Sequence, residues 1–71
     1  MTCFGLTLEK LRKENNEHFL DLANYLEVST IFLAAVERGD RKVPDHWFAL
    51  LGSHYCVDEK ILINLARDAK D

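Results

Sequence analysis

Two short apolar-periodic segments separated by only a few residues constrain the fold of this chain more than any other feature. We predict one helix over residues 18–27 and a second over residues 30–38, because apolar side chains recur in both at helical spacing. Ser29 is a good N-cap for the second helix, since its hydroxyl can accept a free first-turn N–H. Gly39 is a typical helix stop. Two helices joined so closely suit a helix-turn-helix.

Three further segments extend the helical prediction to the rest of the chain. One helix is expected over residues 7–15 with Thr7 as its N-cap, one from about Asp45 after the break at Pro44, and one from Asp58. The β-branched and aromatic residues around the second helix of the pair would also suit a strand, but no other segment offers a β partner. We therefore expect an all-α fold, with all 71 residues in a single domain.

Length and cysteine usage indicate a small cytoplasmic domain without disulfide bonds. A domain of 71 residues lies near the lower limit at which an apolar core is stable without disulfide bonds or a bound metal. Cys3 and Cys56 lie far apart, with no metal-binding or redox spacing, so both are expected to be reduced in a cytoplasmic protein. We expect no signal peptide and no membrane span, because no apolar stretch approaches the roughly 20 residues that cross a bilayer.

Metal binding and catalysis find little support in the sequence. His46, His54 and Cys56 fit no zinc spacing, and helices would not obviously bring them together. A cysteine nucleophile needs a positioned base and a cleft, which a domain this small rarely provides. The chain also lacks a glycine-rich phosphate loop. We therefore expect neither an enzyme nor a protein that holds a metal or cofactor.

Four stretches, taken in order, resemble the Cro/C1-type (Xre-like) helix-turn-helix family over nearly the whole chain. The family pattern includes L-A-x-x-L-G-V-S and I-E-R-G-x-R-x-P, and the matching stretches are LRKENN at 11–16, LANYLEVS at 22–29, VERGDRKVP at 36–44 and YCVDEKILINLA at 55–66. The resemblance implies a five-helix, Cro/C1 repressor-like domain with its motif at about 18–38. It also implies a structural ion pair between Arg12 and Glu37, and a DNA-binding transcriptional regulator of phage-repressor type.

The family's DNA-facing positions are unusually apolar here. The family places glutamine, arginine, serine or threonine at most of the positions that correspond to Phe19, Thr30, Ile31, Ala34 and Ala35. Bidentate contacts to bases are therefore not available from these side chains, whereas contacts to thymine methyl groups are. The resemblance places phosphate contacts on the loop after the second helix of the motif, at Arg38, Arg41 and Lys42.

Residues 46–51, HWFALL, carry more large apolar side chains than one face of a helix can bury. The ordinary interpretation is that they belong to the core. The family often dimerises through its fourth and fifth helices, so the resemblance implies a homodimer. The residues expected at its interface are Trp47, Phe48, Tyr55 and Ile61.

Two functions remain open at this point. The family resemblance favours a protein that binds double-stranded DNA. A formal net charge of −3 weakens that interpretation, because DNA binding draws on a basic face. The apolar recognition helix favours the alternative, a protein–protein interaction module that has lost sequence-specific DNA reading and binds a protein partner through the same face.

Overall fold

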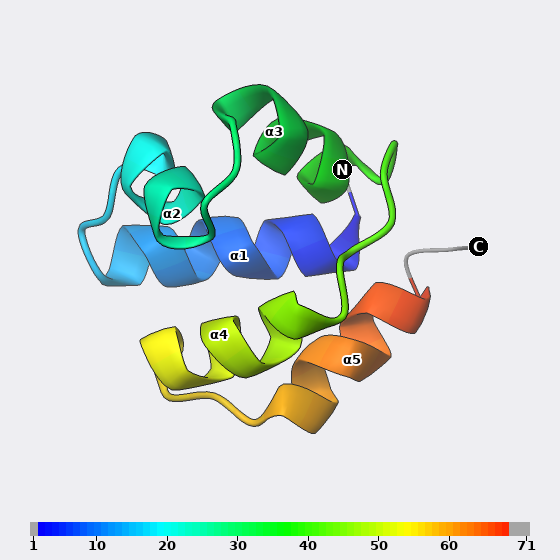
Figure 1. The fold of residues 1–71 in the computed structure, drawn as a ribbon. Coiled ribbons are helices and arrows are strands. Elements are labelled where there is room, and N and C mark those ends of the chain that lie inside the picture. Colours follow the sequence, from blue (N-terminus) through cyan, green and yellow to red (C-terminus); the bar gives the residue numbers. More distant parts are fainter. Residues whose placement is uncertain (1, 69–71) are drawn as a thin grey trace.

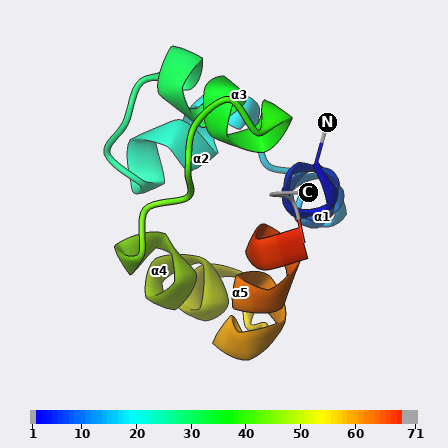
Figure 2. The same cartoon turned by 90° about the vertical axis from the view of Figure 1, so that its right-hand side faces the viewer.

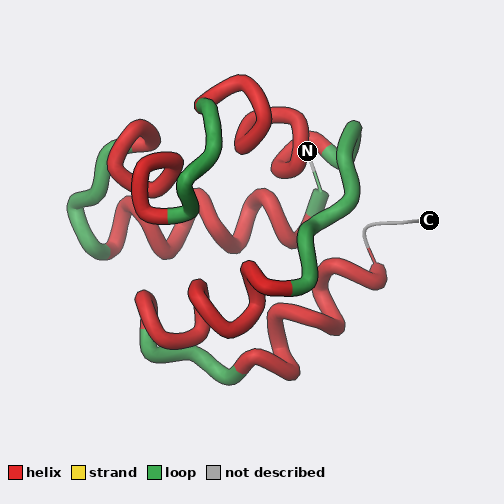
Figure 3. The backbone as a smooth tube through the Cα atoms, viewed as in Figure 1, coloured by secondary structure: helices red, strands yellow, loops and turns green. Residues whose placement is uncertain are grey.

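The computed structural model describes residues 2–68, and its described residues form helices and loops without a strand (Figure 3). The expectation of an all-α fold is therefore confirmed. The helices are α1 Cys3–Glu14, α2 Phe19–Tyr25, α3 Thr30–Arg38, α4 His46–Tyr55 and α5 Glu59–Asp68.

The helix α1 lies between two pairs of helices. In Figure 1, α2 and α3 lie on one side of α1 and α4 and α5 on the other, and Figure 2 shows the same division viewed nearly along α1. The packing follows this order, because α1 contacts both α3 and α5, while α2 contacts α3 and α4 contacts α5. A long loop after α3 connects the two sides.

Every helix contributes a buried leucine to one common core. Leu8, Leu22, Leu33 and Leu51 are fully buried, and Leu62 is 1% exposed. Burying such a side chain stabilises the fold by roughly 1.5–3 kcal/mol relative to leaving it exposed. The helical periodicity seen in the sequence therefore corresponds to five inward faces that meet.

The helix α1 begins more than one turn earlier than predicted, since its N-cap is Thr2 and not Thr7. Thr2 is the actual N-cap, and its Oγ1 accepts the N–H of Gly5 at 3.0 Å. The extra turn places Phe4 in the core with no exposed surface. A Cβ at Gly5 would overlap the backbone carbonyl of Glu37, so only glycine fits this approach of α1 to α3. Tertiary packing thus extends the helix through a residue of low helix propensity.

Among residues 2–68, no single helix has the length and apolar composition needed to cross a membrane. Only α2 and α3 taken together reach that length and composition. These two helices are bent by 100° at their junction.

Candidate nucleic-acid interface

The connection between α2 and α3 consists of residues 26–29 and turns the chain by 100°. Glu27 adopts a left-handed conformation with φ 59°, and its N–H donates to the carbonyl of Asn24 at 3.1 Å. The N–H of Val28 donates to the carbonyl of Ala23 at 3.0 Å. These bonds close the end of α2 and fix the direction in which α3 leaves.

Both ends of α3 are capped as the sequence predicts. Ser29 Oγ accepts the N–H of Phe32 at 3.1 Å at the start of the helix. At its end, Gly39 has φ 93°, a left-handed conformation that favours glycine, and its N–H donates to the carbonyl of Val36 at 3.1 Å. The bounds of α3 are therefore fixed by local chemistry as well as by packing.

The outer side of α3 is dominated by one apolar side chain. Ile31 is 81% exposed, the largest exposed fraction among the exposed large apolar side chains that the structure describes. Thr30, Ala34 and Ala35 are half-buried beside it. In Figure 1, α3 lies on the side of α1 opposite α4 and α5, so its outer side faces solvent. The predicted apolar surface exists, and Ile31 provides most of it.

The predicted contact residue at the start of α2, Phe19, is not the exposed one. Its ring lies under the guanidinium of Arg12, 4.7 Å from the guanidinium carbon, and it is half-buried against the core. The next residue, Leu20, is 58% exposed. Leu20 was missed by the sequence interpretation, although it lies out of phase with Leu22 and Ala23, which are buried. The start of α2 therefore presents Leu20 to solvent.

The ion pair expected between α1 and α3 is present. Arg12 Nη1 lies 3.5 Å from Glu37 Oε2, and both side chains are buried. Burial raises the pKa of Glu37, the charge of Arg12 lowers it, and the charge of Glu9 raises it, with burial the largest effect. Glu37 also holds the start of α1, since its backbone carbonyl accepts a hydrogen bond from Thr2 Oγ1 at 2.9 Å. Glu37 thus fixes the last turn of α3 against α1.

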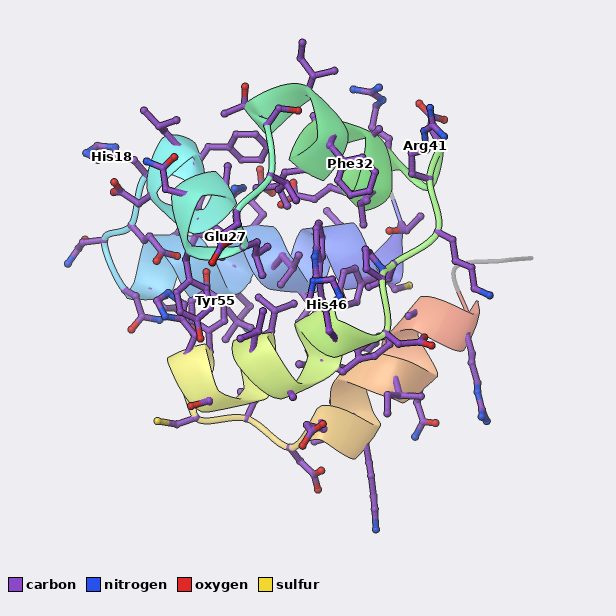
Figure 4. The ribbon with its side chains drawn as sticks, in the orientation of Figure 1. His18, Glu27, Phe32, Arg41, His46 and Tyr55 are labelled. Atoms are coloured by element: carbon purple, nitrogen blue, oxygen red, sulfur yellow. The ribbon has the colours of Figure 1, made fainter. Side chains whose placement is uncertain are left out.

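Three exposed cations lie at the end of α3 and in the loop that follows it. Arg38 is paired on the surface with Asp40, its Nε 3.0 Å from Oδ2. Arg41 and Lys42 are also exposed, and neither forms an ion pair with the residues that the structure describes. Figure 4 shows Arg41 beyond the end of α3, its side chain directed away from α4 and α5. Two of the three predicted phosphate-contact residues therefore carry an unpaired charge.

Three of the four residues expected at a dimer interface, the aromatic residues of α4, are buried within one chain. Trp47 is fully buried, and Phe48 and Tyr55 are each 9% exposed within one chain. Trp47 packs edge-on against Phe32 of α3 at a centroid distance of 5.8 Å. Because α4 packs against α3 as well as against α5, more of its surface is buried than the single face that an amphipathic helix usually buries. Only Ile61, 56% exposed on α5, remains available.

A polar cluster that the sequence did not reveal joins the loop after α1 to the end of α4. Glu17 Oε2 lies 2.6 Å from His54 Nε2, and Glu17 Oε1 accepts a hydrogen bond from the hydroxyl of Tyr55. Tyr25 stacks on His54 at 4.1 Å. Burial and the bond to Glu17 both raise the pKa of Tyr55. No sequence signal marked this cluster, because its members come from three separate segments.

The histidine and cysteine side chains form no metal site in the part of the chain that the structure describes. Within residues 2–68, no group of three or more histidine, cysteine, aspartate or glutamate side chains is placed to hold a metal ion. Comparison of the chain with protein-family models, with curated proteins and with solved structures gives no match.

Proposed function

We propose that this protein is a small DNA-binding transcriptional regulator of phage-repressor type, in which α2 and α3 form a Cro/C1-like helix-turn-helix. A turn of four residues and an angle of 100° fall within the range of DNA-binding helix-turn-helix motifs. The observation that carries the proposal is the position of α3. Its N-terminal end is solvent-exposed, with Ile31 at the outside, and it leads directly into the exposed cations of the following loop.

Phosphate anchoring in this proposal comes from the loop and from the start of α3. Arg41 and Lys42 supply the unpaired charges. At the positive end of the helix dipole, the N–H groups of Thr30 and Ile31 have no backbone or side-chain acceptor among the described residues. Such first-turn N–H groups bind phosphate oxygens well. These contacts position a protein on DNA without specifying sequence.

Sequence reading in this proposal depends on shape and methyl groups. In this proposal the exposed Ile31 contacts the C5 methyl group of a thymine in the major groove, and Thr30 beside it offers one hydroxyl. A bidentate base contact is worth about 1–3 kcal/mol of discrimination, and this face supplies none. We therefore expect modest sequence preference combined with salt-dependent affinity.

The test is a fluorescence anisotropy titration of labelled duplex DNA over about 50–200 mM salt, a range in which phosphate contacts change affinity strongly. Arg41→Gln/Lys42→Gln should flatten the slope of log affinity against log salt by about two units, since each phosphate contact contributes about 0.9. The matched control is Lys10→Gln/Lys13→Gln, which removes the same charge from exposed positions on α1. The control should keep a slope close to that of the wild type. Equal slopes for both double variants would contradict the proposed anchoring.

A second candidate function is supported by the apolar surface itself. Ile31 and Leu20 are 81% and 58% exposed, and a formal net charge of −3 disfavours a polyanion. A protein–protein interaction module would use these side chains to bind an apolar surface on a partner protein. Absence of any anisotropy change at the lowest salt, where phosphate contacts are strongest, would reject DNA binding and favour this candidate.

A further inference from the structure

A pocket of about 500 Å³ lies near the end of α3, between the two sides of the fold. It is bounded by the start of α1, the end of α3, the loop to α4, and the last turns of α5. Its apolar lining includes Phe4, Val36, Phe48, Ile63 and Ala66. A pocket of this size with an apolar lining matches sites that hold small molecules.

The charges that line this pocket differ in sign from the chain as a whole. Among its described lining residues, Arg41, Lys42 and Arg67 are cationic and Asp45 alone is anionic. The whole chain has 12 acidic and 9 basic side chains, so an excess of cations here is a local feature. None of the three cations forms an ion pair with a described residue. The pocket therefore combines an apolar interior with a positively charged edge.

We propose that this pocket binds a small amphipathic anion, with an apolar aliphatic or aromatic body and one acidic group of the carboxylate class. The body would lie against Ile63, Ala66 and Val43, which line the pocket and are half-buried. The acidic group would lie at the edge, near Lys42 and Arg67. A neutral analogue of the same shape would gain the apolar contact and lose the charge attraction.

The pocket shares residues with the proposed DNA contact. Lys42 lines the pocket and is also an unpaired cation of the loop after α3. Arg41 borders the pocket as well, but its side chain is directed away from α4 and α5 (Figure 4). An anion bound beside Lys42 would neutralise charge that phosphate contacts need, so anion and DNA should weaken each other's binding by the same factor. Only this coupling rests on the proposed function. Binding of the anion is measured without DNA, so a failure of one proposal is distinguishable from a failure of the other.

The experiment uses 8-anilinonaphthalene-1-sulfonate as a fluorescent anionic probe, with octanoate and 1-octanol as competitors. The probe should bind saturably to the wild type, and octanoate should displace it more effectively than octanol. Ala66→Phe fills the pocket from α5 and should abolish saturable binding. Arg67→Gln should weaken it about threefold, typical of one exposed charge interaction. Lys60→Gln, an exposed α5 residue that does not line the pocket, is the matched control and should bind as the wild type does.

A second measurement distinguishes binding in the pocket from probe binding elsewhere on the apolar surface. Amide chemical shifts of the wild type titrated with octanoate should change at Gly39, Val43, Ile63 and Ala66, which line the pocket. Thermal unfolding of Ala66→Phe establishes that it remains folded. The proposal is overturned if folded Ala66→Phe binds the probe like the wild type, if octanol competes as well as octanoate, or if the shifts cluster around Ile31 and Leu20.

Discussion

Glu27→Gly should stabilise the protein, because Glu27 holds the turn between α2 and α3 in a conformation that glycine adopts more readily. Its φ is 59°, in the left-handed region, and its side chain is exposed. Its side chain forms no hydrogen bond or ion pair with the described residues. The substitution therefore changes backbone preference and removes little else.

The magnitude follows from two opposing effects. A left-handed conformation costs an L-residue roughly 1–2 kcal/mol, which glycine avoids. Glycine also gives the unfolded chain more freedom, which costs about 0.4–1 kcal/mol. The net gain in the free energy of unfolding is then about 0.5–1 kcal/mol. For a domain of this size that corresponds to a rise in Tm of roughly 4 °C.

Two other positions in the chain provide matched controls. Cys56 has φ 57° at the end of α4, and Asn16 has φ 53° after α1, and both side chains are exposed. Cys56→Gly should stabilise the protein by a similar amount. Asn16→Gly should change it little, because asparagine tolerates this region better than most residues.

Unfolding in urea can be followed by the fluorescence of Trp47, the only tryptophan and fully buried, and by far-ultraviolet circular dichroism. Coincident transitions would support a two-state analysis. If Glu27→Gly lowers the free energy of unfolding by more than about 0.5 kcal/mol, the side chain of Glu27 must make a stabilising contact that outweighs the backbone effect. That result would refute the account given for this turn.

Other substitutions test the packing that holds α3 in place. Gly5→Ala should destabilise the protein by about 2 kcal/mol or more, measured by urea unfolding, because the new Cβ would overlap the carbonyl of Glu37. Glu17→Gln should cost roughly 1–2 kcal/mol by weakening the bond from Tyr55, and Tyr55→Phe should cost a similar amount in the same assay. Burial raises the pKa of Glu37 above its unfolded value, so the folded protein binds more protons between the two values and the free energy of unfolding falls as pH rises through that window. Glu37→Gln should remove this fall, and parallel pH profiles for wild type and variant would contradict the assignment.

The local elements of the fold were predictable because short-range chemistry sets them. The Ser29 cap, the Gly39 stop and the helical spacing of Leu33 and Val36 define α3 in the sequence, and the structure keeps the same bounds. The start of α1 was not predictable, because it depends on the burial of Phe4 in a core whose other walls are distant in sequence.

The surface was less predictable than the helices. The aromatic density of α4 suggested an interface, but the fold buries Trp47 and Phe48 within one chain. The cluster around Glu17 joins residues 37 and 38 positions apart, and no local pattern reports such a contact. By contrast, the exposure of Ile31 followed from its phase on α3, because its position relative to Leu33 and Val36 is set by helical geometry.

The most direct test of the central claim is a map of amide chemical-shift changes in the isotope-labelled protein titrated with a short duplex DNA at low salt. We expect the changes to concentrate in residues 29–35, at the start of α3, and in residues 38–42, at the end of α3 and in the loop that carries Arg41 and Lys42. They should diminish as salt increases, as phosphate contacts do. Shifts centred on α4 and α5, or no shifts at the lowest salt, would contradict the claim that α3 and its following loop bind DNA.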